Sequence, residues 1–165
     1  MRRMFRPFIA ALALVLALGA CGTGGTSGGG VGQISPGDAD QIRLRHVDGV
    51  NAARAQAGVP PVQLSAELTA ASETHARDMA VQNRAWHTGS DLTSFRERAF
   101  RAGYRGELAG ENIAEGSDSD LTVLSNWLNF SDSRGIILDP LARGVGLGWY
   151  QDTSGKTWWV QLIGY

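Results

Sequence analysis

His87 and Glu111 have the side chains that acid–base or metal chemistry needs, and each lies in a short segment that contains glycine. His87 opens the segment His-Thr-Gly-Ser, and Glu111 follows Gly110 in the segment Gly-Glu-Asn-Ile. A carboxylate that holds an imidazole by a hydrogen bond can form part of a general-base apparatus. The same two groups are also common ligands of divalent metals. His87 and Glu111 are therefore the candidate catalytic residues of the chain.

A hydrolase also needs a nucleophile or an oxyanion site, and the sequence offers no convincing one. Ser90, Ser131 and Ser133 are available, but none of them lies in a Gly-x-Ser-x-Gly elbow. A hydrolase would have to use a water molecule or a nearby serine with His87 as the base. The pair can instead tie a loop to the helices through hydrogen bonds, and we favour this structural role over catalysis.

The remaining histidines and two arginines have structural interpretations. His75 lies on the apolar stripe of a predicted helix, which indicates a hydrogen-bonded core histidine. His46 lies on an earlier helix, where we expect a surface or half-buried position. We expect Arg98 and Arg134 to bridge carboxylates inside the domain, and Glu97 to face solvent.

The spacing of apolar residues predicts the elements that position these side chains. Apolar residues at three- and four-residue spacing predict four helices, over residues 38–57, from 65 past 79, 91–102 and 119–130. We expect the third helix to begin at Asp91 and the fourth to begin at Ser119. The inward residues of these two helices include Leu92, Phe95, Ala99, Ala102, Leu121, Leu124 and Trp127.

The pattern changes after residue 143. Residues 144–150 and 157–165 are rich in β-branched and aromatic residues, and the turn signal Asp-Thr-Ser-Gly-Lys separates them. This combination predicts a β-hairpin. Gly146 and Gly148 alternate with larger residues, which suits a strand packed closely under a helix. Helices followed by an antiparallel sheet give an α+β domain over residues 38–165.

The N-terminal residues have the composition of an export signal. Arg2, Arg3 and Arg6 precede an apolar run over residues 9–20. The run is well short of the roughly 20 residues that a membrane-spanning helix needs. It ends in Leu-Gly-Ala before Cys21, the only cysteine of the chain, and this ending resembles a bacterial lipobox. We therefore expect residues 1–20 to be a lipoprotein signal and Cys21 to be lipidated; an ordinary secretory signal beside a free thiol is the alternative.

Residues 22–37 are rich in glycine, serine and threonine, a composition typical of a flexible tether. They do not form a phosphate-binding loop, because no strand precedes them and no Gly-Lys-Ser/Thr follows. The whole chain has 15 basic and 16 acidic residues, and three of the basic ones lie in the leader. An acidic mature domain without a basic cluster predicts no nucleic-acid partner.

Six groups of residues follow one another along the domain. The groups are Val50-Asn51 with Arg54; Leu64, Leu68, Ala71, His75 and Met79; His87-Thr88-Gly89-Ser90 with Arg98 and Gly103-Tyr104; Gly110-Glu111-Asn112-Ile113-Ala114 with Gly116; Trp127, Arg134, Ile137-Leu138 and Pro140; and Val145-Gly146-Leu147-Gly148 with Trp159-Val160-Gln161. Together they resemble the CAP superfamily of cysteine-rich secretory proteins, antigen 5 and pathogenesis-related 1, and its bacterial members in particular. The resemblance implies a three-layer α-β-α sandwich with a mainly antiparallel sheet and a central cleft.

In well-characterised members of the superfamily this cleft holds two histidines and two carboxylates that can bind a divalent metal. By resemblance His87 matches the first histidine and Glu111 one carboxylate, whereas Phe130 and Ser133 occupy the other two positions. Phe130 cannot coordinate a metal and Ser133 is a poor neutral ligand, so His87 and Glu111 are only weak metal candidates and we expect no cofactor. The predicted ligand cleft comprises Trp86, His87, Glu111, Phe130 and Ser133, and its aromatic walls favour an apolar or carbohydrate-like ligand.

Together these features predict an exported cell-envelope lipoprotein, anchored to the membrane through lipidated Cys21. In a Gram-negative cell it would lie in the outer membrane or at a periplasmic face. We expect its domain to be a non-catalytic binding module for an apolar, cell-wall or protein ligand. The alternative is a protease-like hydrolase that uses His87 and Glu111.

Overall fold

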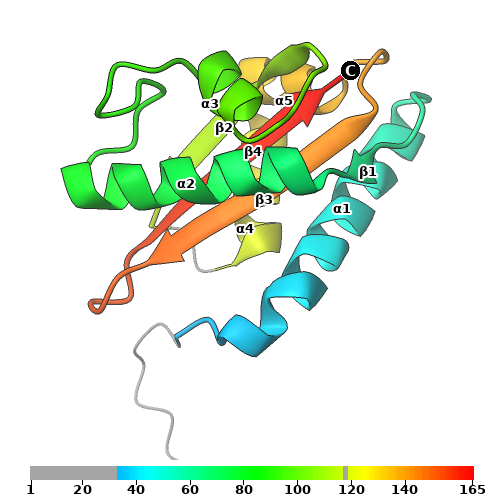
Figure 1. Cartoon of the computed structure of the whole chain (residues 1–165). Helices are drawn as coiled ribbons and strands as arrows, with labels where there is room; N and C mark the ends of the chain where they lie inside the picture. Colours follow the sequence, from blue (N-terminus) through cyan, green and yellow to red (C-terminus); the bar gives the residue numbers. More distant parts are fainter. Residues whose placement is uncertain (1–32, 117–118) are drawn as a thin grey trace, which may run out of the picture.

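The computed structural model of the protein describes residues 33–116 and 119–165 and arranges their elements in three layers (Figure 1). The elements are the 3-10 helix η1 (Pro36–Asp38), α1 (Ala39–Gln56), β1 (Gln63–Leu64), α2 (Ala66–Gln82), α3 (Phe95–Arg101), β2 (Leu108–Glu115), α4 (Asp120–Asn129), α5 (Ser131–Ile137), β3 (Gly144–Gln151) and β4 (Thr157–Gly164). Helices α2 and α3 lie on one face of the sheet, and α1, α4 and α5 lie on the other.

The sheet of the described residues has the order β1-β3-β4-β2. β4 runs antiparallel to β3 and to β2, and the predicted hairpin joins β3 to β4 with Trp149 opposite Trp159. The short strand β1 pairs with β3 in parallel. The architecture confirms the predicted α+β sandwich with a mainly antiparallel sheet.

β4 provides the centre of both hydrophobic layers, because all of its residues are buried. Side chains of successive strand residues point to opposite faces of a sheet. Trp159 and Ile163 accordingly pack in the cluster with α1 and α4. Trp158, Val160 and Leu162 pack in the clusters with α2 and α3. The sequence of a strand that is covered on both faces is a nearly continuous run of apolar residues, and β4 has such a sequence.

Gly146 and Gly148 of β3 allow α2 to lie directly against the strand. A Cβ atom at Gly146 would overlap the backbone of Leu68, and one at Gly148 would overlap the backbone of Glu73. The predicted close approach of a helix to this strand is therefore confirmed, and the helix concerned is α2, which carries His75.

The predicted start of the third helix at Asp91 is wrong. α3 begins at Phe95, where Ser94 and Glu97 form a capping box with hydrogen bonds in both directions. The inward position predicted for Leu92 is wrong as well, since this residue has a φ of 65° and is 81 % exposed. The segment before Ser94 is a loop because its backbone turns at Leu92.

Two longer elements, β2 and α5, carry no clear apolar periodicity and are absent from the sequence-based prediction, as is the two-residue strand β1. β2 reads Leu-Ala-Gly-Glu-Asn-Ile-Ala-Glu, and α5 follows α4 after a non-helical residue, Phe130. Leu121, predicted on the inner face of α4, is 43 % exposed, because it lies at the margin of the contact between α4 and α1 near Gly49.

No helix within residues 33–116 or 119–165 is long and apolar enough to cross a membrane. The predicted signal sequence, Cys21 and the tether up to residue 32 lie outside the described residues. The described part of the tether includes η1, which begins at Pro36, just before the predicted start of the domain.

Candidate functional site

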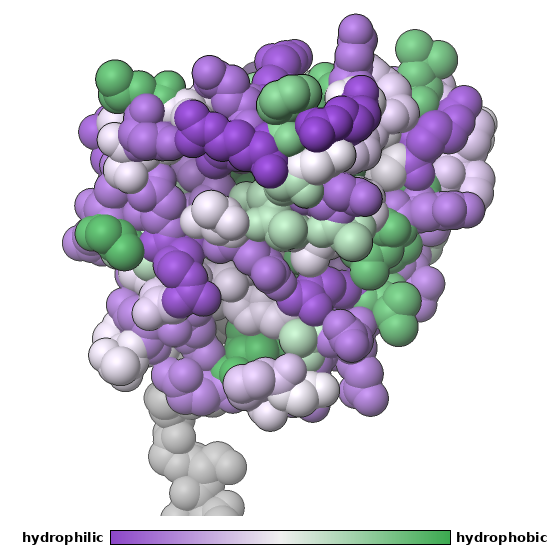
Figure 2. Space-filling model, in the orientation of Figure 1, coloured by the Kyte–Doolittle hydropathy of each residue, from purple (hydrophilic) through white to green (hydrophobic). Residues whose placement is uncertain are grey.

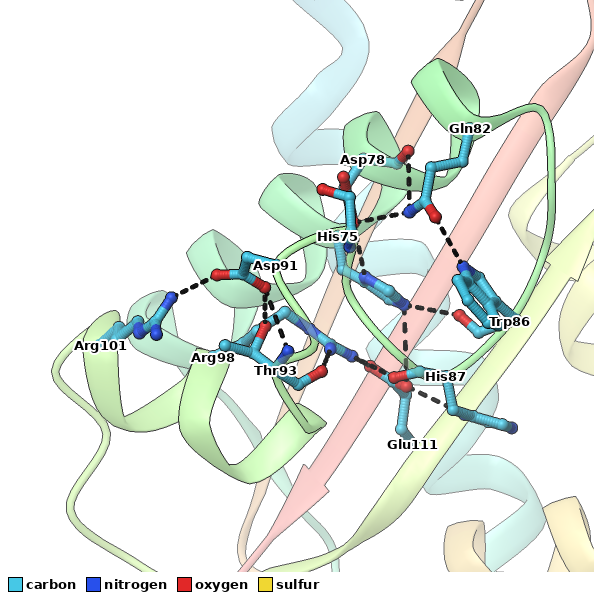
Figure 3. A network of polar contacts seen from close by, with 11 residues as sticks. His75, Asp78, Gln82, Trp86, His87, Asp91, Thr93, Arg98, Arg101 and Glu111 are labelled. Atoms are coloured by element: carbon cyan, nitrogen blue, oxygen red, sulfur yellow. Dashed lines mark hydrogen bonds and ion pairs between the residues drawn. The ribbon is translucent and has the colours of Figure 1, made fainter.

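The candidate site lies where β2 meets the loop between α2 and α3. Glu111 comes from β2, His87 from the loop, Arg98 from α3 and His75 from α2 (Figure 3). β2 pairs with β4 with Glu111 opposite Leu162, whose side chain packs in the layer of α2 and α3. The fold therefore brings together residues that are far apart in the sequence.

Glu111 is the centre of the site, and its two carboxylate oxygens have different partners. The side chain is 1 % exposed. His87 Nδ1 lies 2.9 Å from Oε1, and Arg98 Nη2 donates to Oε2 at 2.7 Å. A buried carboxylate is costly unless it is paired and hydrogen-bonded, so these two contacts hold the charge of Glu111 in the interior. The hydrogen bond expected between His87 and Glu111 and the expected carboxylate bridge of Arg98 are both present.

Arg98 also fixes the loop that carries His87. Its guanidinium donates to the backbone carbonyl of Thr93 at 2.8 Å and to that of His87 at 3.1 Å. The side chain is buried, with 7 % exposure. One arginine thus joins α3, β2 and both ends of the loop, so the imidazole of His87 is positioned by Arg98 as well as by Glu111.

His75 lies behind Glu111 and is fully buried. Its Nε2 donates to the carbonyl oxygen of Trp86 at 2.9 Å, because a carbonyl can only accept. Burial lowers the pKa of His75, and the nearby Glu111 opposes this effect. The expected hydrogen-bonded core histidine is confirmed, and its Nε2 lies 4.0 Å from Glu111 Oε1.

Two aspartates fold the loop back on itself. Asp78 accepts a hydrogen bond from the backbone N–H of Ser90 at 2.8 Å. Asp91 accepts from the N–H and the hydroxyl of Thr93 and pairs with Arg101 at 2.6 Å. The hydroxyl of Thr93 and the guanidinium of Arg101 lower the pKa of Asp91 to about 2. Side-chain contacts of this kind define a loop that has no regular secondary structure.

The imidazole of His87 is the accessible part of the network. Its side chain is 59 % exposed, and its Nε2 makes no hydrogen bond with any described residue. Trp86 is half-buried, donates from Nε1 to Gln82, and lies with its ring 3.9 Å from the guanidinium carbon of Arg84. Trp86 directly precedes His87 in the loop, and Arg84 lies over the Trp86 ring, so this segment presents an imidazole, an aromatic ring and a cation that a ligand can contact.

Phe130 and Ser133, also predicted in the cleft, make no hydrogen bond with His87 or Glu111 in the described part of the chain. Phe130 is 67 % exposed at the junction of α4 and α5. Ser133 lies on α5, and its backbone carbonyl accepts from Asn112 at 3.3 Å. The structure therefore joins two of the five predicted cleft residues by direct contact. It adds Arg98 and His75, for which the sequence predicts structural roles.

The residues present do not fit the divalent metal that the resemblance implies. Oε2 of Glu111 is taken by the guanidinium of Arg98, whose positive charge repels a cation at the same place. Within the described ranges, no group of three or more histidine, cysteine, aspartate or glutamate residues is arranged to hold a metal ion. His87 would be the one remaining neutral ligand, which is too few for a zinc-like site.

The serine candidates do not form a nucleophile with His87 either. Ser90 is exposed and is held through its backbone N–H by Asp78. The hydroxyl of Ser131 donates to Asp132 at 3.2 Å. None of Ser90, Ser131 and Ser133 makes a hydrogen bond to the imidazole in the described residues, so the arrangement lacks the pairing of nucleophile and base that covalent catalysis uses.

A second polar chain runs through the opposite layer and corrects the prediction for His46. Asn112 donates to Gln161 at 3.0 Å, and Gln161 Nε2 lies 2.8 Å from His46 Nε2. His46 Nδ1 lies 3.3 Å from the backbone oxygen of Asp120, whose carboxylate pairs with Arg45. His46 is fully buried, not half-exposed, and burial lowers its pKa to about 4.

Arg54 and Arg134, which belong to the six groups of residues that resemble the superfamily, have different environments. Arg54 is fully buried and donates to the backbone carbonyls of Pro60 at 2.7 Å and Ile137 at 2.7 Å, so it joins α1 to the end of α5. Arg134 is exposed and makes no ion pair with the described residues. The carboxylate bridge expected for Arg134 is therefore not observed, because α5 presents this side chain to solvent.

Known proteins share this sequence pattern and this fold. The pattern of the CAP, or cysteine-rich secretory protein, family matches residues 47–163. The uncharacterized protein YkwD of Bacillus subtilis is 28 % identical over 130 residues, which cover 79 % of this chain and 50 % of that protein. The chain thus spans about half the length of this relative.

Solved structures resemble the fold as well. An extracellular protein containing an SCP domain from Bacillus anthracis has a TM-score of 0.66 and 25 % identity, with 81 % of this chain and 45 % of that chain covered. An outer surface protein of Borrelia burgdorferi has a TM-score of 0.66 and 16 % identity, with 77 % and 93 % covered. Because the family pattern spans well over half of the sequence, the chain belongs to the cysteine-rich secretory protein (CAP) family.

Proposed function

We propose that this protein is an exported, lipid-anchored module of the cell envelope whose CAP domain binds a ligand at the exposed face of His87 without catalysing a reaction. The contacts of the Glu111 carboxylate are the main support for this proposal. Its buried carboxylate is neutralised by Arg98, and its remaining oxygen holds the loop through His87. A carboxylate used in this way stabilises the architecture and leaves the imidazole as a contact group on the surface.

The expected ligand is an apolar, cell-wall or protein component of the envelope. The exposed surface around His87 combines an imidazole with a free Nε2, the ring of Trp86 and the guanidinium of Arg84. Aromatic and arginine side chains are the groups that contribute most to binding surfaces. Two proteins of similar structure are an extracellular protein and an outer surface protein, which supports an extracytoplasmic location.

Co-sedimentation with purified peptidoglycan sacculi tests the binding role. The proposal expects the chain to sediment with the sacculi equally well before and after treatment with EDTA, and to keep its melting temperature. His87→Ala should weaken the sedimentation, and Gln63→Ala at an exposed residue of β1 is the control. If EDTA abolishes both the fold and the binding, a metal holds the domain together and the proposal fails.

The membrane anchor is tested separately through Cys21. Full-length chain expressed in a bacterium should incorporate labelled palmitate and fractionate with membranes. Cys21→Ser should abolish the label and release the protein, because a thioether-linked lipid cannot form on serine. Labelling that persists in the variant would place the lipid elsewhere, and an unlabelled wild-type chain would favour an ordinary secretory signal.

A hydrolase is the second candidate, and one observation favours it. His87 has a carboxylate at Nδ1 and a free Nε2, as a general base requires. The discriminating experiment compares casein hydrolysis and melting temperature in His87→Ala. Hydrolysis that disappears at an unchanged melting temperature would support the hydrolase, whereas a lower melting temperature without any hydrolysis in the wild type would identify the pair as architectural.

A further inference from the structure

A concave site lies between α2, α3 and the loop that precedes α3. Its volume is about 460 Å³, within the roughly 300–1,000 Å³ range of small-molecule sites. Its buried lining residues are Ala71, His75, Thr93 and Arg98, whereas Thr74 and Asp91 are at its rim. His87 and Glu111 do not line it, so it opens apart from the exposed face of His87, although His75 and Arg98 contact Glu111 from its floor.

The face that carries this site is suited to a small polar ligand. Figure 2 shows weakly hydrophobic residues in the middle of the face formed by α2, with hydrophilic residues around them. Three alanines, Ala70, Ala71 and Ala102, supply apolar wall to the pocket. The surrounding groups are polar, so the pocket combines a narrow apolar wall with several hydrogen-bonding groups.

Two buried nitrogen atoms of the floor residues lack a hydrogen-bond partner. Nδ1 of His75 and Nε of Arg98 make no hydrogen bond with any described residue. Asp78 Oδ2 lies 3.9 Å from His75 Nδ1, which is too far for a hydrogen bond. His75 is fully buried and Arg98 is 7 % exposed. Buried polar atoms are nearly always paired in folded proteins, because leaving one unpaired is unfavourable. An unpaired acceptor and an unpaired donor in the floor of one pocket therefore indicate the groups that a ligand would satisfy.

The two atoms need opposite partners. His75 donates from Nε2 to the carbonyl of Trp86, so in the neutral imidazole Nδ1 is an acceptor. Burial lowers the pKa of His75, which keeps the ring neutral. Nε of Arg98 is a donor only, because a guanidinium has no acceptor. The other two nitrogens of Arg98 already donate to Thr93, His87 and Glu111. A hydroxyl group satisfies both atoms, because it can donate to Nδ1 and accept from Nε–H.

The charges around the pocket disfavour an anionic ligand. Arg98 is paired with Glu111 and Arg101 with Asp91, so among the described lining residues Asp78 is left without an arginine partner. A carboxylate ligand offers no donor to Nδ1 and would be repelled by Asp78. An ammonium group offers no acceptor to Arg98 Nε. A neutral hydroxyl group serves both nitrogen atoms and carries no charge that Asp78 repels.

We propose that the pocket between α2 and α3 binds a neutral, polyhydroxylated small molecule of the size of a sugar ring, one hydroxyl of which bridges His75 Nδ1 and Arg98 Nε. The carboxylates and hydroxyls of the rim accept and donate hydrogen bonds to the remaining hydroxyls of the ligand. The methyl groups of the alanine wall contact its C–H face.

Three probes that share one ring and differ in charge test the proposal. D-glucose is neutral, D-glucuronate adds a carboxylate, and D-glucosamine adds an ammonium group. Each is titrated into the ¹⁵N-labelled chain, and the amide shifts of Ala70, Thr74 and Ala102 are followed. Glucose should shift these amides with a dissociation constant in the millimolar range. Glucuronate should bind several-fold more weakly because Asp78 repels its carboxylate, and glucosamine should bind no more tightly than glucose because its ammonium group offers no acceptor to Arg98.

Ala70→Phe fills the mouth of the pocket from α2, so it should abolish the glucose shifts while the chain keeps its fold. Ala52→Phe, at an exposed position of α1 outside the pocket, is the matched control and should leave the shifts unchanged. The proposal is overturned if glucose produces no shifts, if the shifts persist in Ala70→Phe, if glucuronate binds as tightly as glucose, or if glucosamine binds more tightly than glucose.

Discussion

Acidification is expected to destabilise the domain through His46, whose imidazole is enclosed between α1, α4 and β4. In the folded chain burial lowers the pKa of His46 to about 4, whereas in the unfolded chain we expect the ordinary value of roughly 6.5. Above pH 6.5 the ring is neutral in both states, and its contribution to stability is fully present. Between pH 6.5 and 4 the unfolded chain takes up a proton that the folded chain does not, so the free energy of unfolding falls.

The size of this loss follows from the difference between the two pKa values. Each pKa unit corresponds to roughly 1.4 kcal/mol, so the His46 contribution falls by about 3 kcal/mol between pH 6.5 and pH 4. Below pH 4 the ring is protonated in both states, and the loss levels off. The lowered pKa of His75 acts in the same direction, so the total loss in the wild type should exceed the share of His46.

The variant His46→Gln measures the contribution of His46 to the pH dependence of the free energy of unfolding. Glutamine does not titrate, and its amide oxygen can accept from Gln161 in place of the imidazole nitrogen. Unfolding by guanidinium chloride, followed by tryptophan fluorescence between pH 7 and pH 4, gives the free energy of each protein. The advantage of the wild type at pH 7 should shrink by about 3 kcal/mol by pH 4. A difference that stays constant over this range would refute the reasoning, because His46 would then titrate equally in both states.

Further predictions concern packing and the buried charge. Arg98→Ala leaves Glu111 buried without its cation and should lower the free energy of unfolding by about 3–5 kcal/mol, measured by denaturant titration at pH 7; a loss under about 1 kcal/mol would contradict the assigned role of the pair. Gly148→Ala places a methyl group against the backbone of Glu73 and should cost about 1–3 kcal/mol or more. Gly135→Ala meets no atom within 4 Å in α5 and should be neutral or stabilising by up to about 1 kcal/mol, which makes it the control for Gly148→Ala in a thermal melt.

The elements that follow one periodicity could be predicted from the sequence. Residues 144–150 and 157–165 alternate or run apolar because β3 and β4 are covered on both faces, and the glycines of β3 indicated the helix above it. The start of α3 could also have been predicted, since Ser94 and Glu97 have the Ser-x-x-Glu spacing of a capping box. The apolar residue Leu92 instead favoured an earlier start for the helix.

Other parts depend on contacts that no local pattern shows. β2 lacks alternation because its buried Glu111 is held by Arg98 rather than by apolar neighbours, and Asn112 faces Gln161 on the other side of the strand. The burial of His46 likewise depends on Gln161, which lies 115 positions away in the sequence. Buried polar pairs of this kind do not follow the spacing of apolar residues along the chain. The sequence alone therefore favours a half-exposed position for an isolated histidine on a helix.

Arg98 connects the two surfaces for which ligands are proposed. One of its nitrogens holds the carboxylate that positions His87, another holds the carbonyl of Thr93, and its Nε belongs to the floor of the pocket between α2 and α3. The guanidinium is rigid and planar, so a hydrogen bond at Nε constrains the direction of the bond to Glu111. Because Glu111 is buried and has His87 as its other partner, that constraint reaches the exposed imidazole through two hydrogen bonds. A ligand in the pocket and a partner at His87 would therefore be coupled through the same arginine.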